Sequence, residues 1–230
     1  LSKKSGQPVK MVMSRQEVFE CTGPTCGSYG KIKVAANSDG KMVAAQAYLA
    51  FESGGFPGSS MVESGAKCVF AAYDIPNIVI DGYGIVTNKP KTAAYRAPGS
   101  TTAAFASEAV SNEIADELDI DPIEFRLINS AAEGTRRADG PIHPEIGCVE
   151  VLEAMKNHPH YNTPIKGPNR GRGIAVGYWF NAGLESSAAI SVNRNGTVNL
   201  VEGSTDIGGS RTSLSMQAAE VLGIAAEDIN

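Results

Sequence analysis

The sequence predicts an α+β fold with two mixed α/β lobes, residues 1–139 and residues 140–230. With 230 residues, the chain is long enough for two small domains that each bury a core. Strand and helix patterns alternate along it until AAEGTRRADGPIHPEIG, a stretch of glycine, proline and charge that predicts a connection near residue 140. Each lobe also contains an arginine-bearing glycine loop that leads directly into a helix.

Strand patterns dominate the first part of the chain. Alternating apolar residues predict a strand over 7–14. An Asn-Ser-Asp-Gly turn between two apolar segments predicts a hairpin over 31–51. A glycine-rich loop over 52–60, a short helix over 61–73 and a strand over 75–88 follow, and prolines bound this last strand.

Two helices complete the first lobe. The loop YRAPGS, residues 95–100, runs into an alanine-rich helix whose predicted apolar face consists of Phe105, Ala106, Val110, Ile114 and Leu118. The stretch DPIEFRLINSA then predicts a second helix with a capping-box pattern. Asp121 is its N-cap, Pro122 its first residue and Glu124 its third.

The second lobe repeats the alternation. A helix over 148–159 is expected to end at a proline, and strands are expected over 173–180 and within a hairpin over 187–203. The loop STDIGGSRT, residues 204–212, leads into a last helix. Its apolar face is predicted to contain Leu214, Ala218 and Val221.

Both loops suit an anionic ligand, because a helix N-terminus presents unpaired N–H groups and a partial positive charge. Their occurrence in both lobes predicts a ligand clamped between the lobes. The alternatives are a tight turn at Gly208 and Gly209, and an ion pair of Arg96 with a carboxylate such as Glu108. Neither loop matches the P-loop or dinucleotide-binding pattern, and no nucleophile elbow or zinc-binding HExxH motif occurs. The chemistry is therefore expected from a cofactor, or the catalytic group is missing from this piece.

Charge and composition limit the classes of binding partner and the cellular compartment that the sequence predicts. A net charge of -5 and an isoelectric point near 5.3 argue against nucleic acid and anionic membranes as partners. No apolar run is long enough to cross a bilayer and no signal peptide is recognised at the start, so a soluble protein is expected. The spacing of the four cysteines and three histidines predicts reduced thiols and no metal site, and reduced thiols predict a cytoplasmic protein.

Taken together, these motifs resemble a known family. TNKPKTAAYRAPGSTTAAFASEAVSNEIADELDIDPIEFRLINS followed by VEGSTDIGGSRTSLSMQAAEVLGI is similar to the molybdopterin-binding large subunit of the xanthine dehydrogenase, aldehyde oxidase and carbon monoxide dehydrogenase family. The resemblance covers essentially the whole chain. It implies two lobes of the molybdenum cofactor-binding type, with 1–139 as the end of the first and 140–230 as the beginning of the second.

The resemblance also implies a function. A molybdenum hydroxylase oxidises a C–H bond of an aldehyde or N-heterocycle with oxygen from water. Its pyranopterin cofactor is expected between the lobes, in the cytosine dinucleotide form. Electrons leave through [2Fe-2S] clusters toward FAD on partner subunits or domains, so a hetero-oligomer is expected. The residues implied at the cofactor are Arg96, Ala97, Gly208, Gly209, Ser210 and Thr212. Those implied at the substrate are Ser64, Pro98, Tyr178, Trp179 and Phe180; an alternative for the last three is that alternate side chains of a strand fill the core.

Several positions depart from the family pattern. Pro98 stands where purine-oxidising members carry a stacking aromatic, and Ser64 stands where they carry a substrate-orienting arginine, so xanthine itself is not expected as substrate. Ala97 replaces the copper-binding cysteine of carbon monoxide dehydrogenases, so copper is not expected. Gly209 replaces a glutamine that contacts the cofactor.

The resemblance finally implies that the chain is a fragment that is inactive alone. The family's early glycine and glutamine motif is expected before residue 1, and its general-base glutamate after residue 230. No catalytic residue is therefore assigned, and Glu185, Glu202 and Asp206 are expected at the hairpin surface or as loop caps. Because of the departures at Ser64, Pro98 and Gly209, a non-catalytic binding or assembly module that retains the fold stays as the alternative.

Overall fold

The computed structural model describes residues 1–56, 61–180 and 185–230. It divides the chain into two compact units, Leu1–Phe180 and Asn181–Asn230. Both units mix helices with strands, which confirms the predicted α+β class. The predicted boundary near residue 140 concerns lobes of a cofactor-binding assembly and stays a prediction.

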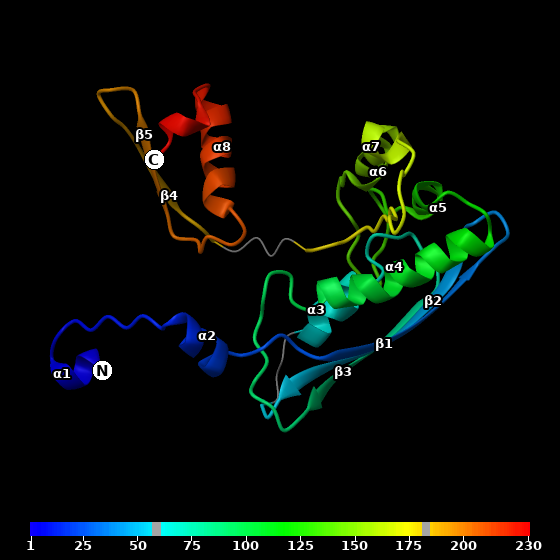
Figure 1. The fold of residues 1–230 in the computed structure, drawn as a ribbon, viewed down its shortest axis with the longest axis horizontal. Helices are drawn as coiled ribbons and strands as arrows, with labels where there is room; N and C mark the ends of the chain where they lie inside the picture. The colour runs from blue at the N-terminus through cyan, green and yellow to red at the C-terminus, as the bar shows by residue number, and fades with distance from the viewer. Residues whose placement is uncertain (57–60, 181–184) are drawn as a thin grey trace. The chain divides into compact units, whose positions relative to one another are not determined.

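The first unit is built on a three-stranded sheet with strand order β1-β2-β3 (Figure 1). Strands β1 (Ser28–Ala36) and β2 (Met42–Gly54) form the predicted antiparallel hairpin, and β3 (Ile78–Val86) pairs with β2 in parallel. Helix α3 (Met61–Cys68) connects β2 to β3. Strand β2 continues to Gly54, so the predicted loop over 52–60 begins later than expected, and its residues 57–60 lie outside the described part.

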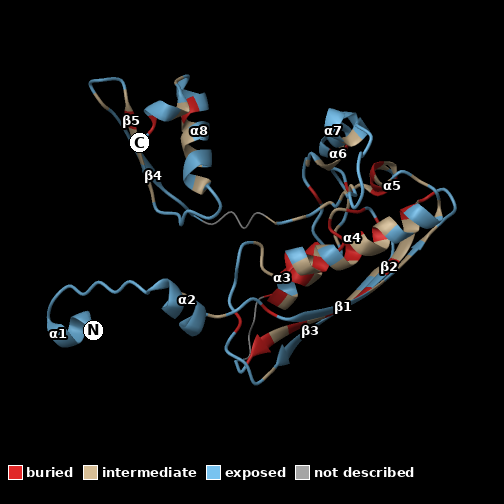
Figure 2. Ribbon diagram, in the orientation of Figure 1, coloured by how far each residue is buried: buried red, intermediate tan, exposed pale blue. Residues whose placement is uncertain are grey.

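The core of the first unit lies between this sheet and the helices that cover one of its faces. Helix α4 (Ser100–Glu117) lies with α3 on that face, and the buried residues gather in β2, α3 and α4 (Figure 2). Ala47, Leu49 and Phe51 of β2 are almost fully buried. Because alternate strand residues face the same side, the odd-numbered residues of β2 meet the helices.

The buried face of α4 differs from the predicted one. Its fully buried residues are small or polar: Ser100, Ala103, Ser107, Glu108, Ser111 and Ala115. Phe105, predicted to face the core, is 79% exposed. Small side chains at four-residue spacing let the helix backbone approach the sheet closely, so the helix turns its narrow face inward.

The remaining helices of the first unit follow in sequence. Helix α5 (Pro122–Asn129) begins where predicted, because the Asp121 carboxylate accepts the N–H groups of Ile123 and Glu124. Helix α6 (Cys148–Asn157) is also confirmed. Helix α6 ends just before Pro159, as predicted, and Pro159 is the first residue of a further short helix, α7 (Pro159–Asn162).

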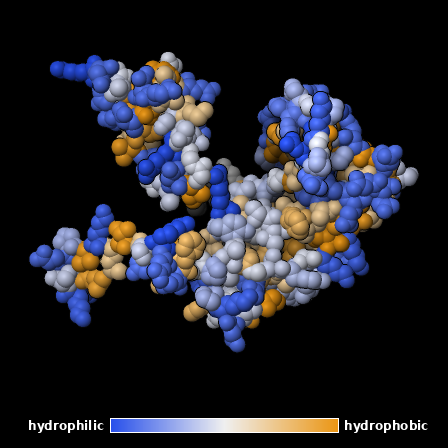
Figure 3. Space-filling model, viewed as in Figure 1, coloured by the Kyte–Doolittle hydropathy of each residue, from blue (hydrophilic) through white to orange (hydrophobic). Residues whose placement is uncertain are grey.

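Two predicted strands are wrong. Residues 7–14 have no strand partner among the described residues, and their apolar side chains lie at the surface (Figure 3). They connect the four-residue helix α1 (Ser2–Ser5) to α2 (Arg15–Cys21), a helix that the capping box formed by Ser14 and Glu17 would have predicted. Residues 173–180 are extended and alternate in burial, but they join no sheet, because their described backbone hydrogen bonds go to side chains.

The second unit is smaller. Strands β4 (Ala188–Val192) and β5 (Val198–Glu202) form the predicted hairpin, followed by α8 (Ser210–Leu222) and a 3₁₀ turn (Ala226–Asp228). Its buried residues are Val198, Ala219 and Ile229. Val221 is 87% exposed, so the predicted face of α8 is wrong at this position, and Ala219 faces the core instead.

Candidate functional site

The arginine loop that precedes α4 has an unusual backbone. Ala97 and Gly99 both have positive φ angles, 54° and 81°. At Gly99 the backbone also approaches α3 closely, because a Cβ placed there would lie 2.3 Å from the Met61 carbonyl oxygen. Left-handed geometry without room for a Cβ requires glycine. The loop backbone therefore packs closely against α3.

The first turn of helix α4 contains no acidic residue. Its N-cap is Gly99, which has no side chain that could cap the helix. The N–H of Ser100 is bound within the loop by the Ala97 carbonyl, at 3.2 Å. A helix of 18 residues with such an N-terminus favours an anion there. Arg96, exposed and four residues before the helix, adds positive charge at the same end.

Residues predicted at the substrate come together beside this loop. Helix α3 carries Ser64, which is 8% exposed, and the next residue, Gly65, packs against the Gly99 backbone. The Ser100 hydroxyl donates to the Tyr178 carbonyl, at 2.8 Å. The structure therefore places α3, the arginine loop and the segment that ends in Tyr178, Trp179 and Phe180 next to one another within the first unit.

Tyr178 faces inward. Its ring meets His143 edge to face at 5.4 Å between centroids, and its hydroxyl accepts from Arg137 Nη1 at 2.7 Å. Arg137 also forms a two-pronged ion pair with Asp139, at 2.8 and 2.7 Å, which holds the pKa of that carboxyl below its usual range. Through these contacts Tyr178 packs against other residues of the first unit, which fits the alternative that it fills the core and does not line a substrate pocket.

Trp179 and Phe180 are arranged differently. Their rings stack at 4.5 Å between centroids, and Trp179 is 45% exposed. The Lys67 ammonium of α3 lies 5.6 Å from the centre of the Phe180 ring. Lys67 also forms an ion pair with Glu63, at 2.5 Å, so both charges lie beside the aromatic pair.

The second loop already contains its own anion. Gly208 and Gly209 have positive φ angles, and Gly209 is the N-cap of α8. The Asp206 carboxylate accepts the Arg211 N–H, which lowers the pKa of Asp206. Ser210 donates its hydroxyl to the Thr205 carbonyl, and Thr212 is exposed. Asp206 is therefore a loop cap, as expected, and it occupies the start of α8.

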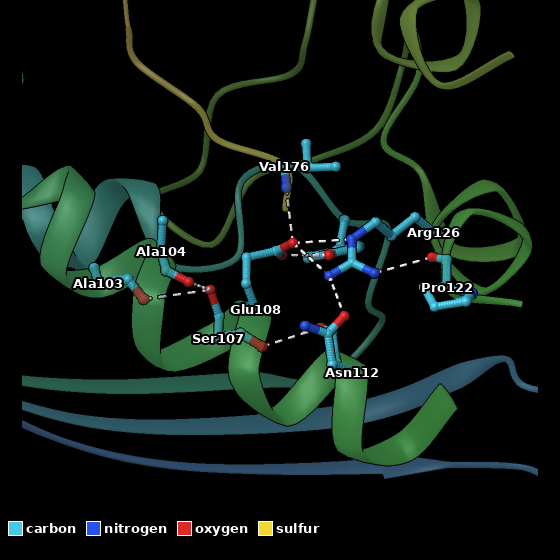
Figure 4. A network of polar contacts seen from close by, with 10 residues as sticks. Ala103, Ala104, Ser107, Glu108, Asn112, Pro122, Arg126 and Val176 are labelled. Carbon is cyan, nitrogen blue, oxygen red and sulfur yellow. Dashed lines mark hydrogen bonds and ion pairs between the residues drawn. The ribbon is translucent and has the colours of Figure 1, made fainter. Parts of the chain in front are cut away.

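The sequence left open an ion pair between Arg96 and Glu108, but the structure pairs Glu108 with another arginine, Arg126. Glu108 forms its ion pair with Arg126 of α5, at 2.8 Å, and both side chains are almost fully buried (Figure 4). Glu108 also accepts hydrogen bonds from the Tyr73 hydroxyl and the Val176 N–H. No local signal in the sequence predicted this network, because the buried face of α4 was predicted to be a different one.

Histidines and cysteines do not gather in the described structure. His143 binds the Ala71 carbonyl at 2.9 Å, and His158 caps α7. Outside residues 57–60 and 181–184, no three His, Cys, Asp or Glu side chains are placed to hold a metal ion. In that same part of the chain, no helix combines the length and apolar character needed to cross a membrane.

Comparisons with known proteins agree on one family. Residues 1–130 and residues 151–230 each match a family described as a molybdopterin cofactor-binding domain. A xanthine dehydrogenase molybdenum-binding subunit of Escherichia coli O157:H7 is 29% identical over 246 residues, which cover 99% of this chain and 32% of that protein. An aldehyde oxidoreductase of Megalodesulfovibrio gigas is 25% identical, over 98% of this chain and 26% of that protein.

Solved structures extend the comparison. The aldehyde oxidoreductase from Desulfovibrio desulfuricans matches with a TM-score of 0.67 and 28% identity, over 90% of this chain and 25% of that one. The quinoline 2-oxidoreductase from Pseudomonas putida has the same TM-score at 22% identity, which indicates a shared fold. The match covers 99% of this chain and 33% of the quinoline 2-oxidoreductase chain. The chain therefore spans about a third or less of the relatives that it matches.

Proposed function

The chain belongs to the molybdopterin cofactor-binding family of xanthine dehydrogenase and aldehyde oxidoreductase large subunits, and we propose that it holds the cofactor of a molybdenum hydroxylase. The reaction would oxidise a C–H bond of an aldehyde or N-heterocycle. The observation that carries the proposal is the arginine loop before α4. It joins a left-handed backbone, an exposed arginine and a first helical turn without an acidic residue.

The first loop fits the anionic part of a pyranopterin cofactor. Arg96 would contribute its guanidinium, and Ala97 its backbone in the left-handed conformation seen here. When bound, the molybdenum centre would supply the oxidation and the oxygen atom derived from water. The chain's own task would be to bind and orient this cofactor. No acidic residue of the chain is proposed as the catalytic base.

The second loop fits an anion less well as it stands. Asp206 occupies the N–H group of Arg211, and a second anion there would meet its negative charge. The cofactor contacts proposed at this loop are Gly208, Gly209, Ser210 and Thr212. For these contacts to form, the Asp206 carboxylate would have to leave the Arg211 N–H, or the ligand would have to bind the hydroxyl groups of Ser210 and Thr212.

The substrate would lie on the aromatic side of the first loop. Trp179 and Phe180 present stacked rings there, and Pro98 adds a small apolar surface. Ser64 is almost buried, so it would contribute shape more than charge. The partners proposed with this site are iron-sulfur and flavin subunits or domains, because a hydroxylation by this cofactor releases two electrons that must leave.

Replacement of Arg96 by alanine in the complete enzyme tests the proposal. Molybdenum content or turnover should fall by about tenfold, the effect of losing one charged hydrogen bond to an anion. Arg194→Ala, at an exposed arginine in the β4–β5 turn, is the matched control and should change neither quantity. If Arg96→Ala behaves like this control in both assays, the loop does not hold the cofactor.

A binding or assembly module without catalysis is the second candidate. The observation in its favour is Asp206, which occupies the start of α8 with the chain's own carboxylate. A complete, correctly assembled subunit that contains no molybdenum would support this candidate and reject the first.

A further inference from the structure

The Glu108 carboxylate connects α4 to segments that lie before and after it in the chain (Figure 4). Its Oε2 atom accepts from Arg126 Nε at 2.9 Å and from Nη2 at 2.8 Å, and Tyr73 donates to Oε1. The Val176 N–H donates to Oε2, at 2.7 Å. The last contact is the only one of these that reaches the extended segment leading to the aromatic pair.

Both charged side chains of this ion pair are buried, which bears on why a carboxylate stands at residue 108. Glu108 is 4% exposed and Arg126 is fully buried, so both charges have lost their water. An apolar pair of similar volume often stabilises a protein as well as such an ion pair does. Stability alone therefore gives little reason for a carboxylate here. A carboxylate does provide directed acceptors for several donors at once, which an apolar side chain cannot do.

The extended segment is attached to α4 at two points. Glu108 binds the N–H of Val176, and the Ser100 hydroxyl binds the carbonyl of Tyr178. Ser100 is the last residue of the arginine loop and the first residue of α4. These two bonds fix the backbone that immediately precedes Trp179 and Phe180, relative to the helix whose start carries the proposed cofactor contact.

We propose that Glu108 is a positioning residue: its bond to the Val176 N–H sets where Trp179 and Phe180 stand beside the arginine loop. This inference rests on the proposed function, because it assigns the aromatic pair to the substrate side of that site. Glu108 itself touches neither substrate nor cofactor. Its effect on catalysis passes through the Val176 backbone.

A pair of variants that differ only at residue 108 isolates this bond. Both carry Arg126→Met and Tyr73→Phe, which remove the other donors and avoid an unpaired buried charge. One adds Glu108→Met, whose thioether sulfur is only a weak hydrogen-bond acceptor. The other adds Glu108→Gln, whose amide oxygen can accept the Val176 N–H. Thermal unfolding establishes that both variants are folded.

Trp179 provides a readout that needs no cofactor, because it is the only tryptophan of the 230-residue chain. In this chain, acrylamide should quench its fluorescence more strongly in the Glu108→Met variant than in the wild type. The Glu108→Gln variant should restore the wild-type quenching. Equal quenching in the two variants would overturn the proposal.

Kinetics of the complete enzyme give the second readout. The Glu108→Met variant should lose roughly tenfold in kcat/KM relative to the Glu108→Gln variant, equivalent to about 1.4 kcal/mol. Both should keep the wild-type molybdenum content. A wild-type enzyme without molybdenum would reject the proposed function. Normal molybdenum with identical kinetics in the two variants would reject only the role of Glu108.

Val176→Pro keeps the test decisive if the Glu108→Met variant does not fold. Proline removes the N–H donor and leaves the ion pair of Glu108 with Arg126 in place. Stronger quenching of Trp179 together with lower kcat/KM would support the proposal. A folded Val176→Pro variant that matches the wild type in both would overturn it.

Discussion

Replacement of Arg126 alone by methionine should lower the free energy of unfolding of the first unit by about 3–5 kcal/mol. The change leaves the Glu108 carboxylate buried without its cation, and an unpaired buried charge is among the most costly defects in a core. Urea denaturation of the chain, followed by Trp179 fluorescence, measures the loss, because this tryptophan lies in the first unit.

The double variant Glu108→Met and Arg126→Met is the control for this prediction. It removes both charges together, so most of the lost stability should return even though the buried hydrogen bonds are gone. If the single and double variants are equally unstable, the cost comes from packing around Arg126 and not from the charge. If neither is destabilised, the ion pair is not buried as described.

Replacement of Gly99 by alanine should destabilise the arginine loop by about 2–5 kcal/mol. Part of this cost is the left-handed backbone, with φ at 81°. The larger part is steric, because the new Cβ would lie 2.3 Å from the backbone oxygen of Met61 in α3. Hydrogen exchange of peptides from α3 and the start of α4 measures the local stability.

Gly209→Ala is the matched control, because Gly209 is also a helix N-cap with a left-handed backbone, at φ 86°. Among the described residues, nothing lies within 4 Å of the Cβ that alanine would add there. Its cost should therefore be limited to the backbone term, about 1–2 kcal/mol, seen in peptides from α8. Equal effects at the two glycines would mean that the contact with Met61 does not constrain the loop.

Local signals predicted much of the fold. The Asn-Ser-Asp-Gly turn gave the first hairpin, and Asp121 with Pro122 gave the start of α5, because each acts within a few residues of chain. The two wrong strands, residues 7–14 and 173–180, have the right alternation. Alternation describes only which side chains share a face, whereas a strand also needs a neighbour for its backbone.

The candidate site was predictable only in part for the same reason. The arginine loop and the helix after it are adjacent in sequence, so their combination could be read directly. The contact of Ser100 with Tyr178 joins residues 78 positions apart, and the bond of Glu108 to Val176 joins residues 68 apart. Such contacts depend on how the elements pack. No local pattern distinguishes a glutamate that binds a distant backbone from one that binds the nearest arginine.

The most direct test of the central claim is elemental and nucleotide analysis of the complete native subunit. Molybdenum should be present near one atom per chain, and acid treatment should release cytidine phosphate if the cofactor is the cytosine dinucleotide form. Release of another nucleotide, together with molybdenum, would correct only the form of the cofactor. Absence of both molybdenum and nucleotide from a correctly assembled preparation would contradict the account and leave a non-catalytic module that retains the fold.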